Sequence, residues 1–199
     1  MTATLRSFAF LVGLITALST IRAETPLLKD DFSDAKLPAR RAMRGDWKFA
    51  NGVATCTQDD ALYKKFQDHG PIIFYDLAHT DATVRFSFKA DGAKTFVFTA
   101  NAEKGHVFRF VMSATGTSIR VFPPDGKAKS IALETEKIPL KSGEWIPVEV
   151  KLHGTKATVK IGEGPAKTYE HASLARAKTN LSVGFSFGTV SVRDFVVTR

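Results

Sequence analysis

Residues 83–112 read TVRFSFKADGAKTFVFTANAEKGHVFRFVM, and three short runs within this stretch decide the fold. In each run, large apolar residues alternate with smaller or polar ones, and short polar turns separate the runs. Alternation with a period of two places one set of side chains on a buried face of a β-strand and the other set on the opposite face. The stretch therefore predicts an antiparallel three-stranded meander, whose buried face carries Val84, Phe86, Phe88, Phe96, Phe98, Phe108, Phe110 and Met112.

The same pattern recurs along most of the remaining chain. Asn51-Gly52 is a two-residue hairpin turn signal, residues 144–152 alternate cleanly, and residues 181–187 and 190–197 form a hairpin around Gly188. Only residues 172–178 favour a helix. Roughly a dozen strands at near-regular spacing predict an all-β fold, namely a two-sheet antiparallel sandwich or jelly roll.

The first 23 residues have the features of a signal peptide. Arg6 provides a positive start, an apolar run extends from Phe8 to Leu18, and Ala23 is a small residue suited to cleavage before Glu24. The run is shorter than the roughly 20 apolar residues that a membrane span needs. We therefore expect residues 24–199 to form a single exported domain with no membrane span, located in the periplasm or outside the cell, and the oligomeric state stays open.

Cysteine content and charge narrow the function classes. Cys56 is the only cysteine, so no intrachain disulfide is possible, and a lone thiol without a nearby His is typical of a packed residue. The net charge is +8 and falls by two when Arg6 and Arg22 leave with the signal peptide. A positive surface favours acidic partners such as anionic polysaccharide. The chain has no basic helix, zinc-ligand pattern or aromatic RNA-binding motif, and these absences together with export argue against a nucleic-acid partner.

Five short sequence motifs follow one another in a recognisable order, and together they span nearly the whole mature chain. They are D-D-F-S (30–33), G-D-W-K-F-A-N-G-V (45–53), A-T-V-R-F-S-F (82–88), S-G-E-W-I-P-V-E-V (142–150) and V-S-V-R-D-F-V-V (190–197). The order resembles the bacterial concanavalin A-like lectin/glucanase sandwiches, and within them the exported modules related to 3-keto-disaccharide hydrolases and the laminin-G-like (LamG-like) group. The resemblance implies two curved sheets, ligands on the concave face or its rim loops, and calcium bound nearby in some members.

The chain departs from these families at the positions that carry their chemistry. Glucanases of this fold hold their carboxylates on one strand as E-x-D-x-x-E, a string absent here; Glu134-Thr135-Glu136 and Glu144…Glu149 are the nearest approaches. Keto-sugar hydrolases usually show an N-S-G-I type segment where this chain has residues 94–98, K-T-F-V-F. Both departures argue against the usual hydrolase mechanism, although an enzyme is not excluded.

A sugar-binding floor is the first site hypothesis. The faces opposite the Phe stripe carry small and hydroxylated residues beside arginines, whose fixed donors suit hydroxyl or acidic groups. The alternative is a solvated outer face of the sandwich. Trp145 would complete the floor as an aromatic platform for stacking, or would instead pack as a plug against the N-terminal segment. The residues of this predicted floor are Arg85, Ser87, Thr99, Arg109 and Trp145, with Ser182, Gly184 and Ser186 on a later strand.

Two further site hypotheses concern titratable residues. For acid–base chemistry the candidates are His106, and His79 with Asp76 and Asp81, although each is also compatible with a turn or surface role. For a metal, Asp30, Asp31 and Asp194 come from the two chain ends and would suit Ca²⁺, which prefers oxygen ligands. The alternative is ion pairing with Arg193 or Lys29 together with turn capping. No cofactor is required by the sequence.

Three functions remain open on these observations. The first is an exported, lectin-like carbohydrate-binding module without catalysis, with some preference for anionic glycans. The second is a glycoside hydrolase or lyase of the 3-keto-disaccharide hydrolase type. The third is a structural or protein-interaction module with no sugar ligand.

Overall fold

The computed structural model describes residues 25–124 and 129–199, so the predicted signal peptide lies outside the described residues. Within the described part of the chain, no helix is long and apolar enough to cross a membrane. The elements, in chain order, are β1 (Leu28–Asp30), β2 (Arg40–Met43), β3 (Lys48–Ala50), β4 (Val53–Gln58), α1 (Asp60–Lys65), β5 (Ile72–His79), β6 (Ala82–Asp91), β7 (Thr95–Asn101), β8 (His106–Ser113), β9 (Gly116–Val121), β10 (Ile131–Glu136), β11 (Trp145–His153), β12 (Lys156–Ile161), β13 (Lys167–Glu170), the 3₁₀ helix η1 (Ala172–Ala175), β14 (Lys178–Ser186) and β15 (Gly188–Thr198).

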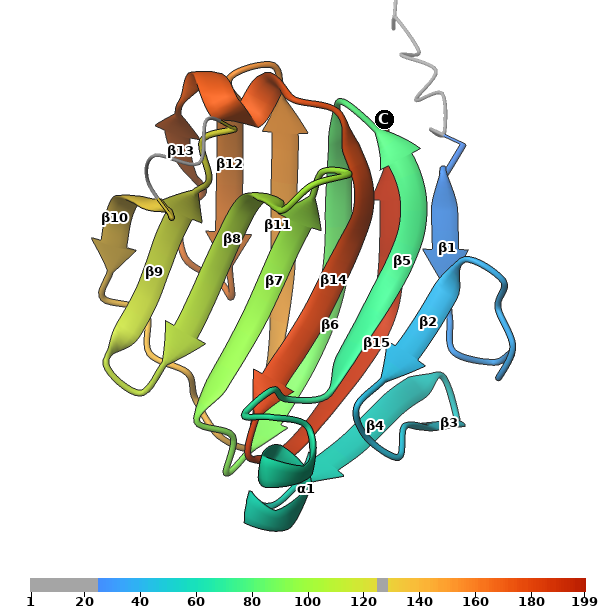
Figure 1. Ribbon diagram of the computed structural model, residues 1–199. Helices are drawn as coiled ribbons and strands as arrows, with labels where there is room; N and C mark the ends of the chain where they lie inside the picture. Colours follow the sequence, from blue (N-terminus) through green and yellow to red (C-terminus); the bar gives the residue numbers. More distant parts are fainter. Residues whose placement is uncertain (1–24, 125–128) are drawn as a thin grey trace, which may run out of the picture.

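Two antiparallel sheets pack face to face and confirm the predicted all-β sandwich (Figure 1). The eight-stranded sheet has the order β13-β12-β11-β6-β15-β4-β3, with β1 beside β15. The seven-stranded sheet, in front in Figure 1, has the order β10-β9-β8-β7-β14-β5-β2. The helix expected over residues 172–178 is reduced to the single turn of η1, because β14 already begins at Lys178.

The predicted meander over residues 83–112 is wrong in its pairing. β6 pairs with β11 and β15 in one sheet, whereas β7 pairs with β8 and β14 in the other. The turn between β6 and β7 therefore carries the chain from one layer to the other. Alternation reports which side chains are buried and does not report which strands are hydrogen-bonded, so the sequence pattern could not distinguish the two arrangements.

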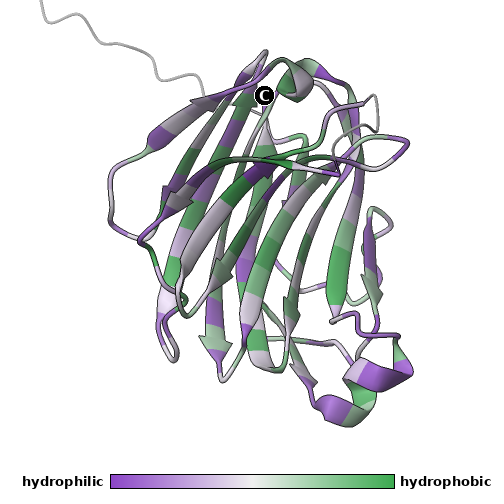
Figure 2. Cartoon of the chain, turned by 60° about the vertical axis from the view of Figure 1, so that its left-hand side comes forward, coloured by the Kyte–Doolittle hydropathy of each residue, from purple (hydrophilic) through white to green (hydrophobic). Residues whose placement is uncertain are grey.

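The predicted Phe stripe does form the core, but it does so from both sides. Side chains of β6 face those of β7 across the interface, and the rings of Phe88 and Phe96 stack with centroids 3.7 Å apart. In the same layer, the ring centroids of Phe86 and Phe98 lie 5.9 Å apart. All eight residues of the stripe are at most 2% exposed. Figure 2 shows the corresponding alternation of hydrophobic and hydrophilic positions along the strands.

Candidate binding groove

A groove with a volume of about 640 Å³ crosses the outer face of the seven-stranded sheet. Alternation in β7 and β14 buries the Phe and Leu side chains and Val183, and leaves the intervening residues, most of them small or polar, on this outer face. The floor consequently includes Thr95, Val97, Thr99 and Asn101 from β7, Arg109 from β8, and Ser182, Gly184 and Ser186 from β14, with the apolar Ile72 and Phe74 from β5 beside them.

The floor is deep as well as polar. Thr99 and Ser182 are each only 3% exposed, although their strands have no second sheet on that side. Hydroxyl groups pair across β7 and β14, where the oxygens of Thr95 and Ser186 lie 2.6 Å apart. A row of hydroxyl groups at the base of a groove offers both donors and acceptors to a polyhydroxylated ligand.

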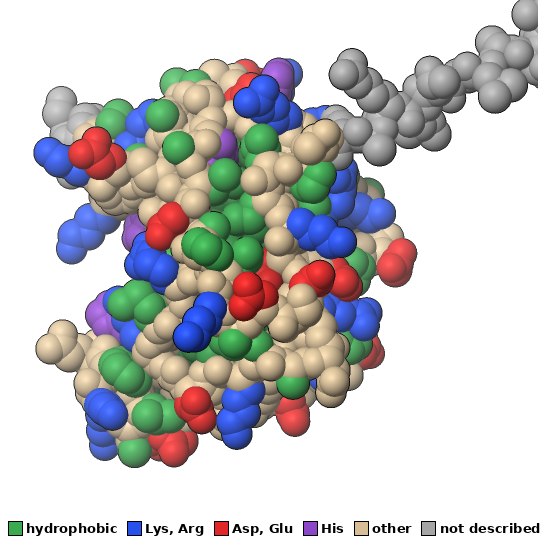
Figure 3. Space-filling view, turned by 90° about the vertical axis from the view of Figure 1, so that its right-hand side faces the viewer, with side chains coloured by type: hydrophobic (Ala, Val, Ile, Leu, Met, Phe, Trp, Pro, Cys, Tyr) green, Lys and Arg blue, Asp and Glu red, His purple; other side chains and the backbone are tan. Residues whose placement is uncertain are grey.

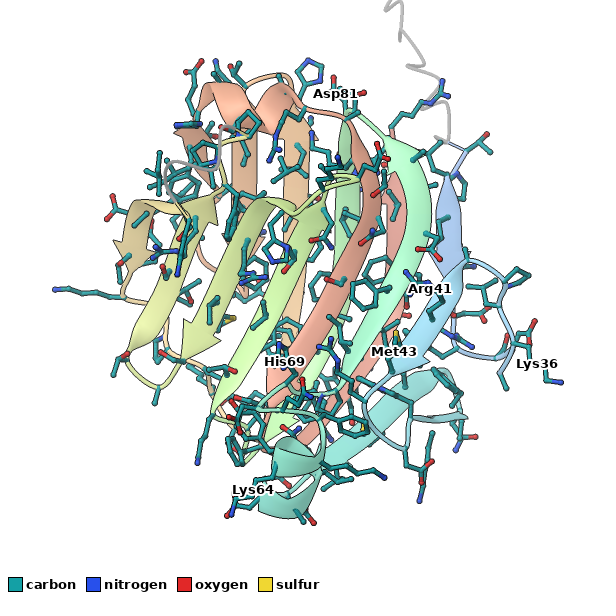
Figure 4. The ribbon with its side chains drawn as sticks, viewed as in Figure 1. Lys36, Arg41, Met43, Lys64, His69 and Asp81 are labelled. Atoms are coloured by element: carbon teal, nitrogen blue, oxygen red, sulfur yellow. The ribbon has the colours of Figure 1, made fainter. Side chains whose placement is uncertain are left out.

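The loop from α1 to β5 forms one rim of the groove. α1 begins after Asp59, whose Oδ1 accepts a hydrogen bond from the backbone N–H of Leu62 (2.8 Å). Its Tyr63 packs against Phe187 with ring centroids 4.6 Å apart. The loop then brings Asp68 and His69 to the groove, and Figure 4 shows His69 over the lower part of this sheet.

A chain of hydrogen bonds fixes the other end of the groove. Arg109 donates from Nη2 to Nε2 of His106 (2.7 Å) and from Nε to Oγ1 of Thr99 (3.2 Å). Because Nε2 of His106 accepts, Nδ1 carries the proton and donates to Oδ1 of Asn101 (2.6 Å). Asn101 in turn donates from Nδ2 to Oδ1 of Asn180 (2.7 Å). The guanidinium of Arg109 is therefore held in one orientation at the floor.

The charge state of His106 agrees with this arrangement. Burial, and secondly the positive charge of Arg109, lower the pKa of His106 to about 4. The imidazole is thus neutral at neutral pH, and both of its ring nitrogens are occupied. His106, predicted as an acid–base candidate, lies in the groove but positions Arg109.

The single floor predicted from the sequence does not form. Arg85 and Ser87 lie on β6 and Trp145 lies on β11, in the eight-stranded sheet, whereas Thr99 and Arg109 lie in the seven-stranded sheet. Arg85 forms an ion pair with Glu149 (2.6 Å). The ring of Trp145 is covered by the guanidinium of Arg193, 4.2 Å from its centroid, with the ammonium of Lys89 at 5.5 Å.

The remaining acid–base candidates do not join His106. Asp76 pairs with Arg41 on β2 (2.6 Å), and Asp81 pairs with His153 (2.9 Å). His79 is buried, with Nδ1 2.9 Å from the carbonyl oxygen of Leu77, and burial is the main cause that lowers its pKa. Figure 4 shows Asp81 at the upper end of the sandwich, far from His69 at the lower end.

The predicted calcium site is also wrong. Asp30 is buried and accepts two hydrogen bonds from Nη1 of Arg40 (2.7 and 2.8 Å) and one from the hydroxyl of Tyr75 (2.9 Å). Asp31 caps a turn through Ser33, and Asp194 lies 3.4 Å from Arg193. Within residues 25–124 and 129–199, no group of three His, Cys, Asp or Glu side chains could hold a metal ion.

Sequence reasoning missed the groove residues that come from outside the alternating strands. Arg44, Asp68 and His69 line the rim from loops, where no periodicity marks a face. Asn101 lies at the end of β7, and its polar side chain on the same face as Thr99 was the available signal.

Comparison with solved structures identifies the architecture. The chain superposes on the carbohydrate-binding module CBM66 from Bacillus subtilis with a TM-score of 0.60 and 10% identity, over 81% of this chain and 96% of that one. It also superposes on the family 7 alginate lyase A1-II′ with a TM-score of 0.54 and 11% identity, over 76% and 82% of the two chains. The chain has a concanavalin A-like sandwich fold.

A third similar structure is a carbohydrate esterase, vb_24B_21, from the Shiga toxin-encoding bacteriophage phi24B. Its TM-score is 0.58 at 13% identity, over 87% of this chain and 98% of that one. No protein-family model matches the sequence, and no protein with curated annotation matches it. At these identities the likeness concerns the fold, and the site must be judged on its own residues.

Proposed function

We propose that this chain is an exported carbohydrate-binding module that holds a glycan in the groove of the seven-stranded sheet without cleaving it. The observation that carries this proposal is the deep floor of hydroxyl groups beside an arginine of fixed orientation. Supporting it, the structural neighbours include proteins named as a carbohydrate-binding module, a carbohydrate esterase and an alginate lyase. Residues 1–23 would direct the chain to the periplasm or the exterior.

Binding accounts for the groove better than catalysis does. Hydrolysis of a glycosidic bond usually needs two carboxyl groups on either side of that bond. Asp68 is the single carboxylate among the described residues that line the groove. His106 would have to abandon the hydrogen bond that Arg109 donates before it could accept a proton from a substrate. The groove is thus equipped to hold and orient a ligand.

A glycoside-cleaving activity of the 3-keto-disaccharide hydrolase type is the second candidate. One observation favours it: Asp68 and His69 are adjacent at the rim and both line the groove. The expected sign of that activity is release of a keto-sugar product, which Asp68→Asn would abolish. If the wild-type chain releases no product from 3-keto-disaccharides, this candidate is removed.

The positive charge of the chain favours acidic over neutral glycans. Figure 3 shows basic and acidic side chains interspersed over the side of the molecule on which β1 and β2 lie. That side of the molecule therefore offers no purely basic surface to an acidic glycan.

A bulky substitution on either face of the sandwich tests the location of the ligand. Ser186→Trp would fill the groove, and Ser87→Trp makes the same change on the outer face of the eight-stranded sheet. A glycan array with residues 24–199 first selects a ligand. We expect Ser186→Trp to weaken its binding about tenfold or more, a loss of at least one good polar contact, while Ser87→Trp retains wild-type affinity. Equal affinity in the two variants would contradict a ligand in the groove, and an array without any hit would contradict the proposed function.

A further inference from the structure

Two arginines lie side by side at the end of the groove. Arg109 on β8 and Arg120 on β9 are directly opposite each other in the strand register. Both alternate with buried core residues, so both belong to the outer face of the sheet. Arg109 lines the groove, and Arg120 lies on the next strand towards the sheet edge.

Neither arginine contacts a carboxylate among the described residues. Arg109 donates to Thr99 and His106, and Arg120 donates from Nε and Nη2 to Oγ of Ser130 (3.0 and 2.7 Å). All of these acceptors are neutral. By contrast, four other arginines of the described chain pair with an acid: Arg40, Arg41, Arg85 and Arg193.

Adjacent guanidinium groups repel each other, and partial burial increases the cost. Burial first, and Arg120 second, lower the pKa of Arg109. A third arginine binds to the backbone at this end of the sheet, where Arg176 donates to the carbonyl oxygens of His106 (2.6 Å) and Phe122 (2.7 Å). An anion between Arg109 and Arg120 would relieve this repulsion.

The geometry also prepares Arg109 to receive an anion. Its guanidinium lies over the ring of Phe122, 5.3 Å from the centroid, and His106 packs edge-on against the same ring at 5.0 Å. Nη1 of Arg109 makes no hydrogen bond to any described residue, which leaves N–H groups for a ligand. An arginine held in a fixed plane loses little conformational entropy when it forms paired hydrogen bonds to a carboxylate or sulfate.

We propose that Arg109 and Arg120 form an anion subsite at the β8–β9 end of the groove, which binds an acidic group of the glycan. This group is the carboxylate of a uronic acid or the oxygen cluster of a sulfate ester. The inference rests on the proposed function, because the subsite continues the same groove. His106 acts as a positioning residue that orients Arg109.

The test uses matched pairs of acidic and neutral ligands. An oligogalacturonate is compared with its carboxyl-reduced form, and dextran sulfate with dextran, by calorimetry on residues 24–199. The variants are Arg109→Gln and Arg120→Gln. Arg85→Gln removes the same charge from the other sheet and serves as the control. Arg120, whose side-chain hydrogen bonds within residues 25–124 and 129–199 go to Ser130, provides a second variant in case loss of Arg109 disturbs the fold.

We expect the wild-type chain to bind at least one acidic member about tenfold more tightly than its neutral partner, as a charge-assisted contact would give. Arg109→Gln and Arg120→Gln should each lose most of that preference, whereas Arg85→Gln keeps both the preference and the affinity. The ligand pair with the larger ratio of acidic to neutral affinity shows whether the subsite prefers a carboxylate or a sulfate. Equal wild-type affinity for acidic and neutral members overturns the anion subsite alone. If Arg85→Gln loses the preference for the acidic ligand to the same extent, the preference comes from the overall positive charge and the anion subsite is overturned. If the wild-type chain binds none of the ligands, the proposed function is overturned as well.

Discussion

Arg40 and Arg41 are neighbours in the sequence but point to opposite sides of β2. The side chains of Arg40 and its partner Asp30 are 2% and 3% exposed, whereas those of Arg41 and its partner Asp76 are both 47% exposed. Arg40 joins β1 of one sheet to β2 of the other and lies over the ring of Phe49. One ion pair is therefore part of the core, and the other is part of the surface.

The two arginines should differ sharply in their effect on stability. Arg40→Leu leaves the carboxylate of Asp30 buried without its counter-ion, and we expect it to lower the free energy of unfolding by about 3 kcal/mol. Arg41→Leu removes an exposed pair and should cost less than about 1 kcal/mol. Urea unfolding of both variants measures the difference. Equal losses of unfolding free energy in the two variants would mean that other groups stabilise the carboxylate of Asp30 when Arg40 is absent.

The sequence could not assign these roles to single residues. The spacing of Asp30, Asp31 and Asp194 suggested calcium because the chain ends were expected to lie together, and β1 does pair with β15. The error arose because Arg40, ten residues away and in the other sheet, reaches Asp30 across the core. Such a contact depends on how two layers stack, and strand alternation carries no information about it.

At the scale of elements, the groove depends on a close approach between the α1–β5 loop and β14. A Cβ atom at Gly70 would lie 1.6 Å from the carbonyl oxygen of Phe185. The N–H of Phe185 donates to the carbonyl of Pro71 (3.2 Å), which holds the loop against the strand. A side chain at position 70 would therefore push the rim away from the floor.

Gly70→Ala should weaken both the fold and the groove. We expect it to lower the free energy of unfolding by about 2 kcal/mol, as overpacking of a tight contact does. Glycan affinity should fall as well, because the rim that carries His69 is displaced. The matched change Gly164→Ala meets its nearest atom at an ordinary 3.6 Å and should leave both properties unchanged. Wild-type stability in Gly70→Ala would show that the rim can move without cost.

The elements themselves were largely predictable, and their arrangement was less so. Alternation identified the strands that carry Thr99, Arg109 and Ser182 and the face on which they lie. It placed Arg85 beside them wrongly, because a short turn after β6 suggested a hairpin when the chain in fact changes sheets. The rim residues Asp68 and His69 come from a non-periodic loop and could be found only from the structure.

On the scale of the whole molecule, the open edges of the two sheets are joined by a polar contact. Glu136 at the end of β10 accepts hydrogen bonds from Lys167 and from the hydroxyl of Tyr169 (2.6 Å) on β13. These bonds lower the pKa of Glu136, with the one from Lys167 as the largest cause. The stability that this contact provides is present above the ordinary pKa of Glu136, which is 4.5, and is lost as the pH falls below it.

The stability of the whole chain should therefore decline in two stages on acidification. The first stage concerns His106, which remains neutral in the folded chain until the pH falls to about 4, whereas in the unfolded chain it takes up a proton near pH 6.5. Between these values the unfolded chain binds more protons, so the free energy of unfolding falls as the pH falls. The buried His79 has a lowered pKa and contributes in the same direction. Glu136 extends the decline below pH 4.5.

Urea unfolding of the wild-type chain and of His106→Gln between pH 7.5 and 3.5 measures both stages. The glutamine can still accept from Arg109 but does not titrate, so the loss between pH 6.5 and 4 should become smaller without vanishing, because His79 remains. The loss below pH 4.5 should be unchanged in His106→Gln and reduced in Glu136→Gln. An identical slope between pH 6.5 and 4 in the wild-type chain and His106→Gln would mean that His106 accepts its proton freely in the folded state. In that case the hydrogen bond from Arg109 does not fix its tautomer, and the orientation of the groove arginine must come from Thr99 and Phe122 alone.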